Sequence, residues 1–293
     1  MKATLLAAVL VAPWLGLASP AAATRMTSSY TSLTVFGDSL VDAGNIYALT
    51  RGQTPSPAAG YFQGRFTNGY DYTDLLSIDL FGRPTTASLL GGRNFAFGGA
   101  RIVDNGDVVP DLSRQIDLYE VARGRTADSN GLYVLNAGGN DVFGAIAGTI
   151  GGADPQRYLQ DAASQYAASV QRLDGLGVRN ILITDFPVAT AGAINTQANA
   201  YLDAALGDLK LSSDTTLYRF SFTDFFNQLS VDPARFGLPA LDLSTTCQAA
   251  GAAAIASGCA PMKQASLARV SSRRFNQTCL GPALSKPSCR KRS

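Results

Sequence analysis

The sequence predicts an α/β domain in which a parallel sheet lies between layers of helices. Short apolar runs suited to strands alternate with segments whose apolar residues recur at helical spacing. One run, Ile181-Leu182-Ile183, is apolar at consecutive positions, as expected for a strand covered on both faces. With 293 residues, 46% hydrophobic and 16% charged, the chain can bury a sizeable core. The alternation fades after Asp242, which favours one domain before that point.

Five strands are predicted in chain order, and most end in Gly-rich or polar turns. The first leads directly into Gly37-Asp38-Ser39, so that a strand is expected to hand over to a helix at Ser39. The five runs are Leu33–Phe36, Asn94–Phe97, Leu132–Asn136, Asn180–Thr184 and Leu217–Phe220.

Helical spacing marks the segments between these runs. One helix has a single apolar face made of Leu112, Ile116 and Tyr119. A longer helix repeats at spacings of four, four, four and three, and a short one is expected around Asp224–Leu229. The apolar positions of the longer helix are Tyr158, Ala162, Tyr166, Val170 and Leu173.

The segment Thr50–Tyr70 is rich in Gly, Pro and aromatic residues and is expected to be a structured loop near the site rather than a linker. Its aromatic side chains suit either an apolar groove or packing within the loop. They are Tyr61, Phe62, Phe66 and Tyr70.

The N-terminus has the design of a secretory signal. A basic Lys2 precedes the apolar stretch Ala3–Leu17, and Ala21–Ala23 supplies small residues for cleavage after Ala23. The stretch is shorter than a membrane span, and no later run approaches about 18 uninterrupted apolar residues. The sequence therefore predicts a signal peptide over 1–23 and an exported protein, periplasmic or secreted; a retained anchor is the alternative.

Charge and cysteines divide the chain unevenly. The first 262 residues carry 16 of the 24 Lys and Arg and all 22 acids, a formal charge of −6, whereas the last 31 carry 8 basic residues and no acid. This basic tail suggests contact with an anionic surface, or else sequence from another reading frame. All four cysteines lie in the last 47 residues, and Cys247 with Cys259 is the expected disulfide in an oxidising compartment.

Three strand ends carry residues suited to acyl transfer. Ser39 follows the first strand, where a hydroxyl is exposed at the carboxyl edge of a sheet. Gly98-Gly99 follows the second, where a backbone N–H can approach a substrate oxygen. Asn140 follows the third, where its amide can donate to the same oxygen. By itself, the Gly-Asp-Ser pattern is equally typical of an ordinary strand-to-turn junction, and the Gly98-Gly99 and Asn140 patterns are more often ordinary turns.

The three blocks together resemble the GDSL, or SGNH, lipases and esterases over roughly residues 30–240. Phe36–Asn45 is similar to the block around the nucleophile, Asn94–Ala100 to the Gly block and Gly138–Asp141 to the Asn block. Gly64–Gly69 with the following Asp74 also resembles a segment common in the lipase-like branch. The predicted organisation is a hydrolase domain over 24–242 and a divergent cysteine-containing tail over 243–293.

This resemblance implies a flavodoxin-like three-layer sandwich and a serine ester hydrolase. Ser39 is the implied nucleophile, and its N–H, that of Gly99 and the Asn140 amide are the implied oxyanion donors. Gly98 is the alternative if the register shifts by one. The implied partner is a small-molecule or lipid ester, with no metal or organic cofactor. The acidic body shows no motif for nucleic-acid recognition.

The fourth block of the family, Asp-x-x-His near the C-terminus, has no counterpart, because the chain contains no histidine. The closest segment by position is Asn276-Gln277-Thr278-Cys279, in which both key residues differ. Degeneration of the block and a frameshift after Asp242 both explain this. Removing the base of a serine triad lowers the chemical step by roughly 10⁴–10⁶. Three hypotheses follow: a weak or inactive hydrolase, a ligand-binding protein without turnover, and a surface module acting through its basic tail.

Overall fold

The computed structural model describes residues 30–187, 192–236 and 289–291. Its elements in chain order are β1 (Leu33–Gly37), α1 (Asn45–Leu49), η1 (Pro57–Ala59), α2 (Tyr72–Phe81), η2 (Ser88–Leu90), α3 (Leu112–Arg123), β2 (Leu132–Asn136), α4 (Gly139–Ala147), α5 (Pro155–Gly175), β3 (Asn180–Thr184), α6 (Gly192–Gly207), β4 (Thr216–Phe220), α7 (Phe222–Val231), η4 (Ala234–Phe236) and β5 (Cys289–Lys291).

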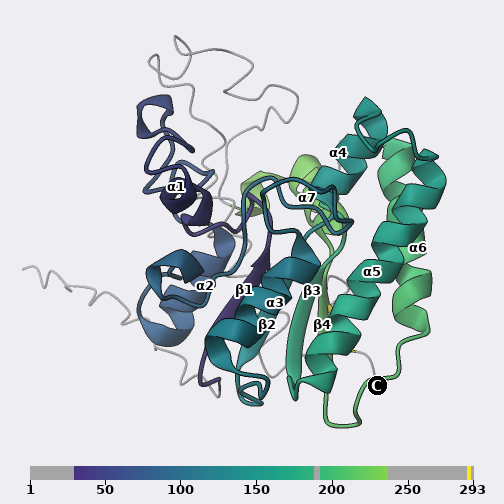
Figure 1. Cartoon of the computed structure of the whole chain (residues 1–293). Coiled ribbons are helices and arrows are strands. Elements are labelled where there is room, and N and C mark those ends of the chain that lie inside the picture. The colour runs from purple at the N-terminus through teal and green to yellow at the C-terminus, as the bar shows by residue number, and fades with distance from the viewer. Residues whose placement is uncertain (1–29, 188–191, 237–288, 292–293) are drawn as a thin grey trace, which may run out of the picture.

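A single sheet in the order β1-β2-β3-β4-β5 forms the centre of the fold (Figure 1). The first four strands run parallel, and β5 pairs antiparallel with β4. In register, Gly37 at the end of β1 lies opposite Asn136 at the end of β2. Four of the five predicted strands are confirmed, each within one residue of its predicted bounds.

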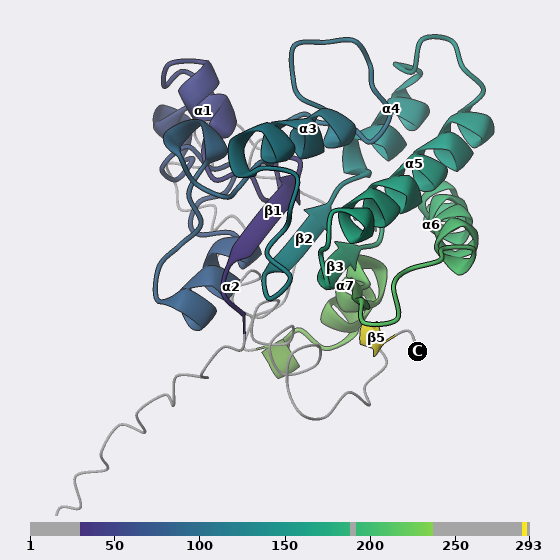
Figure 2. The same cartoon turned by 60° about the horizontal axis from the view of Figure 1, so that its bottom comes forward.

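Two apolar cores cover the two faces of this sheet. Alternate strand residues face opposite sides, so Tyr133 and Leu135 pack with α3, α5 and α6, whereas Leu132 and Val134 pack with α2 and α7. Figures 1 and 2 show α3 and α5 crossing one side of the sheet and α7 on the other. The predicted α/β fold with a parallel sheet between helices is confirmed, and it is the fold expected of an SGNH hydrolase.

Helix boundaries follow from caps that the sequence carries. Asp71 accepts the N–H groups of Thr73 and Asp74 at the start of α2, which ends at Gly82 with a φ of 76°. Asp154 caps α5, with Pro155 at its first helical position. The apolar faces predicted for α3 and α5 are buried, which confirms both helices.

One predicted strand is wrong. Asn94–Phe97 lies in parallel beside β1, since Phe95 and Phe97 donate to the carbonyl oxygens of Val35 and Gly37, but only Asn94 forms an isolated bridge. On its other side there is no strand among the described residues. The amide of Asn45 instead donates to the carbonyl oxygens of Asn94 and Ala96, both at 2.8 Å. The backbone of residues 86–88 also bonds this side, but only at Asn94, which donates to the carbonyl oxygen of Thr86 and accepts the N–H of Ser88. A side chain and a single bridge thus take the place of an outer strand.

No strand was predicted in the tail, yet its residues 289–291 form β5 against β4. The proposed signal peptide, the Cys247–Cys259 pair, and Asn276 with Cys279 lie outside the described residues. No helix within the described part of the chain is long and apolar enough to cross a membrane.

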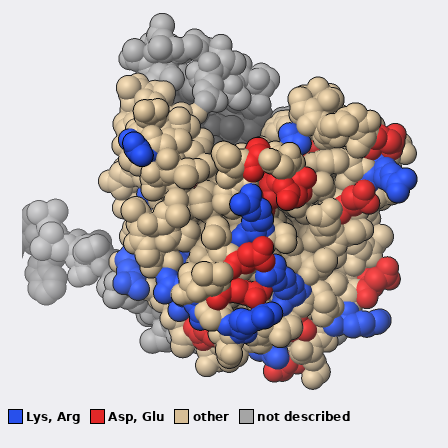
Figure 3. Space-filling view, viewed as in Figure 1, with Lys and Arg blue, Asp and Glu red and all other residues tan. Residues whose placement is uncertain are grey.

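Acidic and basic side chains alternate on the face that carries α3 and α5 (Figure 3). Arg172 of α5 bonds Asp117 and Glu120 of α3, which links the two helices. No large patch of one sign therefore covers α3 and α5 on this face.

Candidate active site

Ser39 lies in a tight turn directly after β1. The N–H of Val41 donates to the carbonyl oxygen of Asp38 at 3.2 Å, and the N–H of Leu40 donates to the Asp38 carboxylate at 3.0 Å. Ser39 is half-buried, and neither its hydroxyl nor its N–H has a hydrogen-bond partner among the described residues. The turn therefore presents both groups of Ser39 for other contacts.

The expectation that β1 hands over directly to a helix is wrong. The helix α1 begins only at Asn45, and its first N–H groups are already bonded. Asp42 accepts the N–H of Gly44 at 2.8 Å, of Asn45 at 2.6 Å and of Ile46 at 3.2 Å. The N-terminus of this helix is thus satisfied by a side chain of the protein and is not aimed at an anion near Ser39.

The two glycines of the second block have different environments. A Cβ on Gly98 would lie 2.3 Å from the ring of Phe66, so this position requires glycine for packing. Gly99 has open space around it but a φ of 91°, a backbone conformation that favours glycine. The N–H of Gly98 donates to Asp42 at 2.9 Å, whereas that of Gly99 has no partner among the described residues. Of the two, only Gly99 has an N–H available to a substrate oxygen.

Asn140 lies in the first turn of α4. Its side-chain amide donates to the carbonyl oxygen of Ala100 at 2.8 Å, a contact that only the NH₂ end of the amide can make. One N–H of that group is therefore fixed against the Gly99 segment, and the second remains available. Gly138, which precedes α4, packs against Phe186, whose ring would lie 2.2 Å from a Cβ at that position.

Backbone pairing brings the three predicted site residues to one edge of the sheet. Gly37 pairs with Asn136, and the N–H of Phe97 donates to the carbonyl oxygen of Gly37. Ser39, Gly99 and Asn140 each follow one of these positions by two to four residues. The helices α1 and α4, which follow β1 and β2, lie at the same end of the sheet (Figure 1).

Gly37 allows this edge to form. Its φ is 151°, and a Cβ there would lie 2.1 Å from the carbonyl oxygen of Asn136. The side chain of Gln115 in α3 accepts the N–H of Gly37 and donates to its carbonyl oxygen, both at 2.8 Å. This contact fixes the end of β1 immediately before the turn that carries Ser39.

Buried carboxyl groups surround the site. Burial raises the pKa of Asp38 to about 7, and the neighbouring charges of Asp141 and Asp42 add to the shift. Burial also raises the pKa of Asp42 and of Asp141, although the N–H groups that each accepts act in the opposite direction. These groups are shielded from water, since Asp38, Asp42 and Asp141 are at most 2% exposed.

The aromatic residues of the 50–70 loop pack mainly with one another. Tyr61 stands edge-on to Phe66, and Phe62 to Tyr70, with ring centroids 6.0 and 5.1 Å apart. Arg65 lies over the Tyr70 ring. Phe66 alone reaches the site, through its contact with Gly98. Of the two expected roles of these rings, the contacts support packing within the loop rather than lining of an apolar groove.

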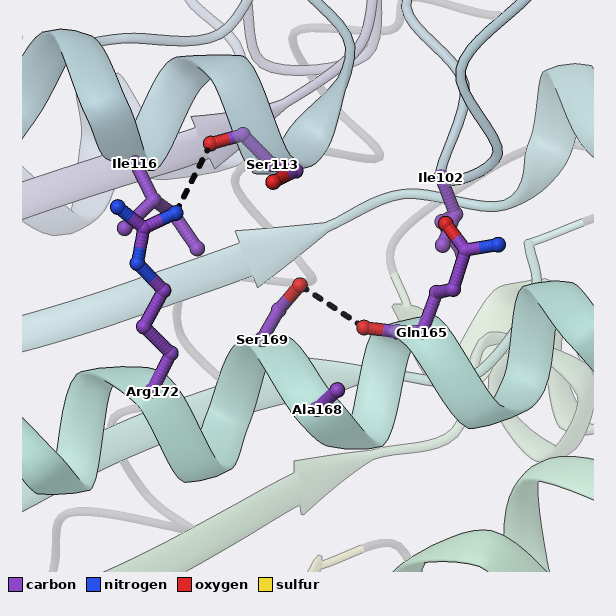
Figure 4. A pocket seen from close by; sticks show the side chains of 7 residues that line it. All are labelled: Ile102, Ser113, Ile116, Gln165, Ala168, Ser169 and Arg172. Carbon is purple, nitrogen blue, oxygen red and sulfur yellow. Dashed lines mark hydrogen bonds between the residues drawn. The ribbon is translucent and has the colours of Figure 1, made fainter.

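A hollow of about 150 Å³ lies between α3 and α5 (Figure 4). It contains none of the predicted site residues, and two of its polar side chains are bonded to the protein backbone. Arg172 donates to the carbonyl oxygen of Ser113, and Ser169 to that of Gln165. The hollow is therefore separate from the edge that carries Ser39.

Sequence reasoning assigned no role to four side chains that build this edge: Asp42, Asp111, Gln115 and Asp141. Asp42 lies within the Phe36–Asn45 block and Asp141 within the Gly138–Asp141 block. An acidic residue among apolar and Gly residues could therefore have marked both as buried polar groups of the site. Gln115 lies on the apolar face of α3, and no pattern in the sequence marks it. Within the described residues, no group of three His, Cys, Asp or Glu side chains is placed to hold a metal ion.

A parallel α/β sheet with Ser, Gly and Asn at successive strand ends is the architecture of the SGNH hydrolases. Residues 33–266 match the family model of GDSL-like lipases and acylhydrolases, well over half of the chain. The chain therefore belongs to the GDSL-like lipase/acylhydrolase family.

Three relatives are similar in sequence to part of this chain. A GDSL esterase/lipase of Arabidopsis thaliana is 26% identical over 272 residues, covering 73% of each chain. A second one is 30% identical over 221 residues, 58% of this chain and 60% of its own. Lipase 1 of Photorhabdus luminescens is 31% identical over 166 residues, 54% of this chain and 22% of its own. The chain thus spans less than two thirds of the length of the last two.

Proposed function

We propose that this protein is an exported serine ester hydrolase whose site retains its nucleophile and oxyanion donors but lacks the histidine base. The observation that carries the proposal is the pattern of used and unused donors at one sheet edge. The N–H groups of Ser39 and Gly99 have no partner among the described residues, and the amide of Asn140 has one N–H to spare. Three such donors at one edge of the sheet suit the negative oxygen of a tetrahedral intermediate.

In the reaction, the Ser39 hydroxyl attacks the carbonyl carbon of an ester, and the carbonyl oxygen becomes the anion held by the three donors. Loss of the alcohol leaves an acyl group on Ser39, which water then releases as the acid. A base must accept the proton of Ser39 in the first step, and the chain has no histidine to do so. We therefore expect turnover lower by roughly 10⁴–10⁶ than with an intact triad.

Hydrolysis of a short-chain nitrophenyl ester tests the proposal, with the mature protein measured beside Ser39→Ala and with added imidazole as an external base. We expect near-background rates in buffer and a Ser39-dependent increase as imidazole is added. Robust turnover without imidazole that requires Ser39 would show that another group acts as the base. An identical imidazole response in both proteins would exclude Ser39 as the nucleophile. An Asp-x-x-His in another frame of the gene would explain the missing block.

The missing base also favours a second candidate function, the binding of lipid or acyl-ester ligands without turnover. Saturable ester binding by a protein that shows no imidazole-dependent hydrolysis would support it.

The proposal has two further parts: the protein is exported, and its basic 263–293 tail contacts anionic membranes. Cleavage after Ala23 on secretion, and salt-sensitive vesicle binding that is lost on deleting the tail, would support these two parts.

A further inference from the structure

Three buried carboxylates hold the segment that carries Gly99. Residues 98–105, called the Gly99 loop below, donate five backbone N–H groups to them. The bonds run from Gly98 to Asp42 (2.9 Å), from Arg101 to Asp111 (2.6 Å), from Ile102 and Val103 to Asp141 (2.9 and 3.2 Å) and from Asn105 to Asp111 (3.0 Å). Each carboxylate is at most 2% exposed.

Asp42 connects the nucleophile turn to the Gly99 loop. The same carboxylate that accepts the N–H of Gly98 also accepts the first N–H groups of α1. Asp42 stands three residues after Ser39, and Gly98 immediately precedes Gly99. One buried group therefore fixes the distance between the segments that hold two of the proposed oxyanion donors.

Asp141 makes the corresponding connection to the third donor. It follows Asn140 directly, and its two oxygens accept the N–H groups of Ile102 and Val103. Tyr158 of α5 donates its hydroxyl to the same carboxylate at 3.0 Å. Asn140 itself bonds the carbonyl oxygen of Ala100. The start of α4 is thus bonded to the loop through two successive residues, Asn140 and Asp141.

Gly99 forms no hydrogen bond with any described residue that would set the direction of its N–H, and its positive φ belongs to the flexible range of glycine. Its orientation follows from the bonds on either side of it. An oxyanion donor misplaced by about 1 Å loses much of its effect.

We propose that Asp42 and Asp141 are positioning residues that align the Gly99 N–H and the Asn140 amide with the oxygen bound at Ser39. This inference rests on the proposed function and adds two residues to its machinery. Asp111 bonds the same loop through Arg101 and Asn105, but it belongs to neither the Ser39 turn nor the start of α4, so it does not connect the loop to either of the other two donors.

The test measures oxyanion binding without requiring turnover. The Ser39 oxygen bonds to the boron of butylboronic acid, and the serine proton passes to the buffer. The resulting tetrahedral boronate is an anion that resembles the tetrahedral intermediate. At equilibrium this adduct needs no general base. Its dissociation constant is measured by titration for wild type, Ser39→Ala, Asp42→Asn, Asp42→Ala, Asp141→Asn and Tyr158→Phe.

Asp174→Asn is the matched control. Asp174 is also buried and accepts the N–H and hydroxyl of Ser212 and the hydroxyl of Thr215, but it lies at the end of α5, before β3 begins. The melting temperature of every variant separates loss of fold from loss of alignment. Tyr158→Phe removes one support of Asp141 without altering either carboxylate, so it remains informative if an Asp variant fails to fold.

We expect about tenfold or weaker boronate binding for Asp42→Asn and Asp141→Asn, a larger loss for Asp42→Ala, and a few-fold loss for Tyr158→Phe. Asp174→Asn should lower the melting temperature with unchanged boronate affinity. Wild-type affinity in the folded Asp42, Asp141 and Tyr158 variants, or an equal loss in Asp174→Asn, overturns the inference. A wild-type protein without Ser39-dependent binding overturns the proposed function itself, and this inference with it.

Discussion

The backbone N–H of Gly98 is bonded to the carboxylate of Asp42 at 2.9 Å, and this bond distinguishes Gly98 from Gly99. Because the N–H of Gly98 is already bonded, the hydrogen bonds favour Gly99 rather than Gly98 as the donor to the oxyanion. The two glycines should therefore respond differently to the same substitution.

Gly98→Ala should destabilise the fold more than Gly99→Ala. The added Cβ at 98 would lie 2.3 Å from the Phe66 ring, and relieving such overpacking costs about 1–3 kcal/mol. At 99 there is no clash, and the positive φ alone costs about 1–2 kcal/mol. Urea unfolding measures both. Phe66→Leu should restore part of the stability of Gly98→Ala and none of that of Gly99→Ala; equal behaviour of the pair would contradict the packing described.

Asn140→Leu should abolish tight boronate binding with little loss of stability. The substitution removes the amide that is proposed to donate to the oxyanion, and one such donor is worth about 10²–10³ in rate. The bond to Ala100 is lost as well, but Asn140 is only half-buried, so a change in unfolding free energy of about 1 kcal/mol is expected. Titration with butylboronic acid and urea unfolding provide the two readouts. Unchanged boronate affinity would remove Asn140 from the site.

Strand and helix positions were predictable because they depend on local apolar periodicity. The β2 and β3 strands agree with the prediction to the residue, since their apolar residues are buried on both faces. The Asn94–Phe97 segment has the same local pattern, but its outer contacts are a single bridge to Ala87 and the side chain of Asn45, which is 49 residues distant in the chain. Periodicity carries no information about such a contact.

The site was predictable to the extent that it lies at strand ends. Ser39 and Asn140 follow neighbouring parallel strands, and Gly99 follows a segment bonded in parallel to β1, so this pairing brings the three to one edge. The groups that align them are different in kind. Asp42 and Asp141 act through backbone N–H groups of residues 98–103, and a backbone donor has no signature in the sequence.

Asp38→Asn should flatten the dependence of stability on pH. The folded-state pKa of Asp38 is about 7, above the value of about 3.9 for an unfolded carboxyl, because burial disfavours its charge. Its contribution to stability is therefore complete below about pH 4 and is lost as the pH rises through 7, on the order of 4 kcal/mol in total. Asparagine cannot titrate, so the variant should lose less stability than wild type between pH 4 and 8. The unfolding free energy of each protein is measured with urea across this range. The same pH dependence in both proteins would contradict the raised pKa of Asp38.

Asp74→Ala should be the most destabilising of these substitutions. Asp74 is fully buried and bonds Arg65, itself 5% exposed, and it also accepts the N–H and hydroxyl of Thr85 at 3.0 and 2.6 Å. Its removal leaves a buried guanidinium without its carboxylate, which costs about 3–5 kcal/mol. The matched control is Asp117→Ala, which breaks an exposed pair with Arg172 and should cost less than about 1 kcal/mol. Because Arg65 neighbours Phe66, which packs on Gly98, boronate binding should also weaken in Asp74→Ala, whereas Asp117→Ala should leave it unchanged. Equal unfolding free energies for the two variants would show that burial does not set the strength of the Arg65 pair.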